Sequence, residues 1–88
     1  MPTITLTIRN PVGLHARPAA LFVQTAQRYA SEIRVRSGGR EANAKSILGI
    51  LTLGAGQGAI IAVEAEGEDA PQALAALQAL VERDLESA

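Results

Sequence analysis

The chain has no cysteine and a single histidine among its 88 residues, which restricts the chemistry open to it. Without thiols it can form neither disulfide bridges nor a thiolate nucleophile. Zinc sites need three or four protein ligands, and these usually include several cysteines or histidines. We therefore expect no metal site and no cofactor.

Aromatic residues and net charge are also scarce. Phe22 and Tyr29 are the only aromatic residues, and the formal net charge is −1. Binding to nucleic acid needs a basic surface, or aromatic side chains on which bases can stack. We expect no nucleic-acid partner, and a core packed from aliphatic side chains.

Long hydrophobic runs are missing as well, since no segment approaches the roughly 20 apolar residues of a membrane span. Segment 1–10 alternates apolar and polar residues, unlike a signal peptide. We expect a soluble, cytoplasmic protein without a membrane partner.

Apolar residues make up 48% of the chain, which at this length is enough for one compact core. Residues 1–88 should therefore form a single domain.

Hydrophobic periodicity predicts the element order βαββαβα. Apolar residues alternate where strands are expected, recur every three or four residues where helices are expected, and flank a Gly-Gly hairpin turn at 38–39. This order favours an α+β fold in which helices cover one face of an antiparallel four-stranded sheet. The predicted strands are 4–8, 32–36, 40–43 and 59–66, and the predicted helices lie at 16–29, 47–51 and within 68–85.

Two polar residues are expected to cap helices. Ser46 precedes the short helix at 47–51, and Asp69 precedes the last helix, where Pro71 suits the first turn. The apolar stripe of the last helix is expected to face the core, and it consists of Ala73, Leu74, Leu77, Leu80 and Val81.

The one histidine lies in the segment NPVGLHARPAA, between a turn and the start of the helix at 16–29. If His15 is the N-cap, the backbone N–H groups of Ala16 and Arg17 have no intrahelical partner. Pro18 has no N–H. The helix dipole is positive at this end, and the guanidinium of Arg17 can grip an oxyanion. The segment thus predicts an anion-binding site beside an imidazole.

The positive field disfavours the imidazolium form, so we expect a neutral, nucleophilic ring. A neutral imidazole can attack phosphorus and can later leave again, which suits a reversible phosphohistidine. The alternative from the residues alone is that His15 is only a polar cap. No partners for a catalytic triad can be placed from the sequence.

Three segments resemble the HPr family, the histidine-containing phosphocarriers of the phosphoenolpyruvate-dependent sugar phosphotransferase system. They are GLHARPA at 13–19, KSILGILTLG at 45–54 and GEDAPQALAAL at 67–77. The likeness covers nearly the whole chain, in order and with the family's spacing. It implies an open-faced β-sandwich with sheet order 1-4-2-3 and three helices on one face.

The resemblance also implies roles for single residues. His15 would accept a phosphoryl group at Nδ1 from enzyme I and pass it to enzyme IIA, and Arg17 would stabilise the charge in transfer. The protein would be a monomeric carrier and not an enzyme. Ser46 would be the target of an HPr kinase/phosphorylase, which adds a transcriptional regulator as a partner of the phosphorylated form. A phosphate there adds about −1.5 to −2 charges at the N-terminus of a helix.

The helix at 47–51 is too short to bury all of its apolar residues. We assign Ile50 and Leu53 to the core and expect the others to meet partners. The predicted docking patch consists of Ile47, Leu48, Leu51 and Gly54.

Other functions remain open at this point. The chain could be a regulatory module that signals through Ser46 with an idle His15, a carrier of a nitrogen-related paralogous system, or a small metabolite sensor. It also departs from the family's pattern, because Val12 stands where a small polar residue is common. Many members are basic at three further positions, which here are Gln24, Gln27 and Gly49.

Overall fold

A computed structural model describes residues 2–85 of the chain. Among the helices of these residues, none combines the length and the hydropathy that a membrane span requires. The elements, in chain order, are β1 (Thr3–Thr7), α1 (Ala16–Gln27), β2 (Glu32–Ser37), β3 (Arg40–Asn43), α2 (Ile47–Thr52), β4 (Ile60–Glu66), α3 (Ala70–Ala79) and the π-helical turn η1 (Leu80–Asp84).

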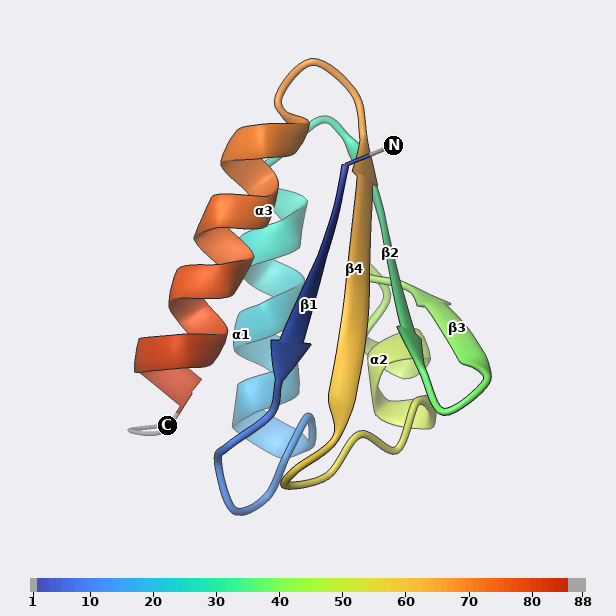
Figure 1. Cartoon of the computed structure of the whole chain (residues 1–88), viewed down its shortest axis with the longest axis vertical. Helices are drawn as coiled ribbons and strands as arrows, with labels where there is room; N and C mark the ends of the chain where they lie inside the picture. The colour runs from blue at the N-terminus through green and yellow to red at the C-terminus, as the bar shows by residue number, and fades with distance from the viewer. Residues whose placement is uncertain (1, 86–88) are drawn as a thin grey trace.

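The four strands form one antiparallel sheet in the order β1-β4-β2-β3, as predicted. β4 lies between β1 and β2, so its long apolar stretch is central in the sheet. The helices lie on one face, with α1 beside α3 and α2 at the end near β3 (Figure 1). The open-faced α+β sandwich is therefore confirmed.

The core is one aliphatic cluster between the sheet and the helices. Inward residues of neighbouring strands pair across the sheet, such as Leu6 with Ile61 and Val35 with Val63. Phe22 of α1 is fully buried against them, which contributes about 1.5–3 kcal/mol relative to an exposed side chain. The stripe predicted for the last helix is buried throughout, and it runs on from α3 into η1.

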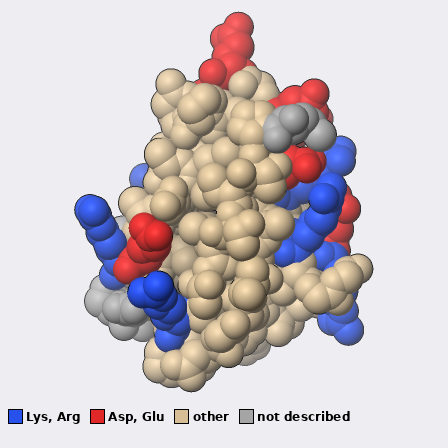
Figure 2. Space-filling model, viewed as in Figure 1, with Lys and Arg blue, Asp and Glu red and all other residues tan. Residues whose placement is uncertain are grey.

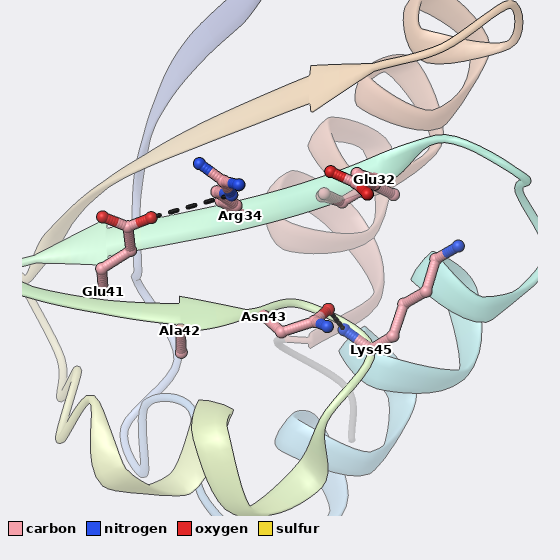
Figure 3. Close-up of a pocket in the computed structure, with 7 residues that line it drawn as sticks. Glu32, Arg34, Glu41, Ala42, Asn43 and Lys45 are labelled. Atoms are coloured by element: carbon pink, nitrogen blue, oxygen red, sulfur yellow. Dashed lines mark hydrogen bonds and ion pairs between the residues drawn. The ribbon is translucent and has the colours of Figure 1, made fainter.

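The other face of the sheet is open and charged. Arg34 and Arg36 of β2 approach Glu41 of β3 at 3.8 and 3.5 Å, and Arg36 also lies 3.6 Å from Glu64. Such exposed pairs contribute about 0–1 kcal/mol each. Figure 3 shows a hollow beside the Arg34–Glu41 pair, and its lining includes none of the predicted site residues among those described. By contrast, the face seen in Figure 2 is mostly uncharged, and the charged side chains stand at its margins.

Asp69 occupies the N-cap position of α3, but it does not act as the predicted side-chain cap. Its carboxylate instead accepts hydrogen bonds from the backbone N–H of Ala30 at 2.8 Å and of Ser31 at 2.9 Å, and from the Ser31 hydroxyl. These bonds join the turn after α1 to the start of α3. The sequence prediction failed because the competing donors lie almost forty positions away along the chain.

The Asp69 contacts predict an acid-sensitive contribution to stability. The Ser31 hydroxyl and the Ala30 amide lower the pKa of Asp69 from its ordinary value. A carboxylate with a lowered pKa in the folded state stabilises the fold above its unfolded pKa of about 4, and loses that effect as the pH falls through the folded pKa. Ser31→Ala should therefore lower the free energy of unfolding at pH 7, and the difference from wild type should shrink below about pH 4. Urea denaturation at several pH values measures this, and a difference that stays constant to pH 2 would contradict it.

Candidate functional site

His15 is the N-cap of α1, as predicted, with extended backbone angles (φ −138°, ψ 154°). Its side chain is exposed and makes no capping hydrogen bond to the first turn of the helix. The ring is therefore accessible to a partner, and its nitrogens are not occupied by the helix that it begins.

The segment before His15 is held against the loop that follows α2. The N–H of Leu14 donates to the carbonyl of Ala55 at 2.8 Å, and the Leu14 side chain is buried. Gly13 has φ +67°, and a Cβ there would lie 2.3 Å from the Ala55 oxygen and 2.5 Å from the Cα of Gly56. This close backbone approach explains the glycine before the histidine motif, and it brings the end of α2 next to the start of α1.

Ala16 adopts a left-handed conformation with φ +52°, alone among the described non-glycine residues. This conformation costs roughly 1–2 kcal/mol for a residue with a Cβ. Within residues 2–85, no backbone acceptor is recorded for the N–H of Ala16 or Arg17. Both residues are exposed. Two free amides and the positive end of the helix dipole thus lie within one helical turn of His15, and Arg17 adds an exposed guanidinium from the same turn, an arrangement suited to an oxyanion.

Ser46 caps α2 as predicted, because its Oγ accepts from the N–H of Gly49 at 3.1 Å. The preceding residue, Lys45, accepts through its carbonyl from Nε2 of Gln27 at 3.2 Å, which places the start of α2 near the end of α1. His15 lies at the opposite end of α1. The 12 residues of α1 span about 18 Å at 1.5 Å of rise per residue, which exceeds the screening length of roughly 8–10 Å in physiological salt.

The structure divides the predicted docking patch. Leu48 and Ile47 are 73% and 41% exposed, and Gly54 is exposed, whereas Ile50 and Leu53 are buried as predicted. Leu51 is half-buried and packs against the core. It therefore offers partners less surface than the helix pattern indicated, because its side chain packs against the core cluster.

Sequence analysis did not assign Val12 to the patch, although it is 59% exposed in the loop that carries His15.

Two basic side chains, those of Lys45 and Arg40, donate hydrogen bonds to backbone carbonyls. Nζ of Lys45 donates to Tyr29 at 2.6 Å, and Nη1 of Arg40 donates to Thr52, the last residue of α2, at 2.9 Å. The exposed apolar side chains of this region are those of Val12, Ile47 and Leu48.

The fold and the site together define a class: small open-faced α+β proteins that present an exposed histidine at the N-terminus of a helix. A family model described as the PTS HPr component phosphorylation site matches residues 2–83. The chain belongs to this HPr family of phosphocarriers of the phosphotransferase system.

Individual relatives agree with this assignment. The chain is 47% identical over 77 residues to the phosphocarrier protein HPr of Xylella fastidiosa, covering 88% of this chain and 86% of that protein. It is 46% identical over 77 residues to the HPr-like protein Crh of Halalkalibacterium halodurans, covering 88% and 92%. A crystal structure of HPr-C-His from Thermoanaerobacter tengcongensis superposes with a TM-score of 0.91 at 50% identity, covering 93% and 92%.

Proposed function

We propose that this protein accepts a phosphoryl group on Nδ1 of His15 from enzyme I and passes it to an enzyme IIA protein in the cytoplasm. The observation that carries the proposal is the exposed His15 ring, which makes no cap hydrogen bond and lies beside free amides at the start of α1. Enzyme I and phosphoenolpyruvate should add one acid-labile phosphate per chain. No uptake from a competent enzyme I would refute the proposal.

In this proposal the transfer is a displacement at phosphorus. A bond forms between phosphorus and Nδ1 as the bond from phosphorus to the donor breaks, and the reverse displacement regenerates the free ring. The N–H groups of Ala16 and Arg17 and the guanidinium of Arg17 meet the phosphoryl oxygens, where charge is concentrated in both steps. The protein acts as a co-substrate, because each cycle needs two partners.

The exposed apolar surface of α2 supports partner docking through Leu48. We expect Leu48→Ala to raise the KM for phosphorylation by enzyme I about 5- to 20-fold, because a buried Leu at an interface is worth roughly 1–2 kcal/mol. Stability should hardly change. Ile60→Ala is the matched control, since Ile60 is 64% exposed but lies on β4 with Thr5 and Ala62, on the sheet face that the helices leave open. Equal KM values for both variants would contradict the assignment.

A second candidate function is regulation through Ser46, and two observations favour it. Ser46 Oγ sits at the N-cap of α2, where an added phosphate meets the positive end of the helix. The similarity to the HPr-like protein Crh also extends over most of the chain. Incubation with ATP and an HPr kinase/phosphorylase, compared with phosphoenolpyruvate and enzyme I, separates the two functions.

Charge at Ser46 should act on partners more than on His15 itself. Given the separation along α1, we expect Ser46→Asp to raise the KM for enzyme I about 3- to 10-fold at low salt, with less effect at high salt. Ser46→Ala is the control, because it removes the cap, costs about 1 kcal/mol of stability and adds no charge. A salt-independent effect shared by both variants would assign the change to loss of the serine hydroxyl and not to charge.

A further inference from the structure

Asn10 lies beneath the loop that carries His15, and only 2% of its surface is exposed. Its Nδ2 donates to the carbonyl of Gly13 at 2.8 Å. Its own backbone carbonyl accepts from the N–H of Gly13 at 3.1 Å. Asn10 thus holds the glycine at two points, once through the backbone and once through the side chain.

The side-chain oxygen of Asn10 is buried and has no hydrogen-bond partner among residues 2–85. An asparagine that opens a turn ordinarily uses this oxygen to accept from the backbone two residues on. Rotating the carboxamide would set its oxygen against the Gly13 carbonyl, where two acceptors repel. A buried acceptor without a partner opposes folding. The carboxamide of Asn10 keeps this orientation nevertheless, because it lets Nδ2 donate to the Gly13 carbonyl.

The peptide after Gly13 is held from both sides. Its carbonyl accepts from Asn10, and its N–H, which belongs to Leu14, donates to Ala55 of the neighbouring loop at 2.8 Å. His15 follows Leu14, and its side chain makes no capping hydrogen bond to the helix. The direction in which the imidazole leaves the backbone therefore depends on how this peptide is fixed.

The left-handed angle of Ala16 is a second reason to expect such a constraint. A non-glycine residue keeps this conformation only where its surroundings determine it. We infer that Asn10 is a positioning residue for His15: its carboxamide fixes the peptide after Gly13 and so sets the imidazole against the free amides at the start of α1. This inference rests on the proposed phosphoacceptor role of His15.

The test compares Asn10→Ala and Asn10→Ser with Ser31→Ala. The alanine variant should lower kcat for phosphorylation by enzyme I about 10-fold and leave KM within about twofold, because misplacement affects transfer and not docking. The serine variant keeps a donor and should recover part of kcat. Ser31→Ala removes a part-buried hydrogen bond near the far end of α1, about 18 Å along the helix, and should change neither constant. Wild-type kcat in Asn10→Ala would overturn the inference.

A second measurement does not need enzyme I. Wild type and both Asn10 variants are phosphorylated chemically with phosphoramidate, and hydrolysis of the phosphohistidine is followed at neutral pH by ³¹P NMR. Hydrolysis should be about 5-fold faster in Asn10→Ala, where the phosphate is less well held; equal rates in a folded variant would overturn the inference. Failure of enzyme I to phosphorylate wild type would instead refute the proposed function, and the hydrolysis rates would still test Asn10.

Discussion

Replacing His15 with alanine should abolish phosphorylation by enzyme I, with at least a 100-fold loss in the rate of phosphate uptake. No other histidine is present in the chain, so no second imidazole can take its place. The side chain is exposed and makes no capping bond, so the variant should fold normally. Radioactive or ³¹P-detected uptake from phosphoenolpyruvate measures the loss.

Two controls make this result specific. The free energy of unfolding of His15→Ala should match that of wild type within about 0.5 kcal/mol, as for other surface substitutions. Arg17→Lys keeps the cation but loses the guanidinium fork, and it should slow transfer without abolishing it. Phosphate uptake by His15→Ala at the wild-type rate would show that the acceptor lies elsewhere.

Gly13→Ala should cause the largest loss of stability of any glycine substitution near the site. The new Cβ would meet backbone atoms of Ala55 and Gly56 at 2.3 and 2.5 Å, and backbone cannot move aside as a side chain can. The positive φ adds its own cost, and together we expect about 2–4 kcal/mol. For a domain of this size, that lowers Tm by roughly 10–20 °C.

Gly39→Ala is the matched control for the backbone angle. Gly39 has φ +81°, but a Cβ there would have no atom within 4 Å among the described residues. It should therefore cost only the conformational part, about 1–2 kcal/mol. If thermal denaturation gave equal losses for the two variants, the contact between the histidine segment and the loop after α2 would be wrong.

Most of the fold could be predicted from the sequence because its signals are local. Alternating apolar residues in β1 and β2, the Gly-Gly turn and the stripe of α3 each depend on periods of a few residues. The two central glycines of the hairpin do have positive φ, at 55° and 81°, as a tight two-residue turn between β2 and β3 requires. The same locality explains why Ser46 was placed correctly as a cap.

The features that sequence analysis missed depend on contacts between distant segments. Asp69 looked like a helix cap, but it binds the turn at Ala30 and Ser31, which only the packing of α3 against α1 brings near. Leu51 looked exposed, but it is half-buried because it packs against the core cluster. Asn10 is buried although it lies in a turn segment, which no periodicity shows.

The free amides at the start of α1 are central to the proposed phosphoryl transfer. The direct test is an amide ¹H–¹⁵N NMR spectrum of the protein before and after phosphorylation of His15. Hydrogen bonds to phosphoryl oxygens should move the amide proton signals of Ala16 and Arg17 strongly downfield, while Gly49 of α2 stays in place. Unmoved Ala16 and Arg17 amides in a fully phosphorylated sample would show that the phosphoryl group is held by something other than this helix end.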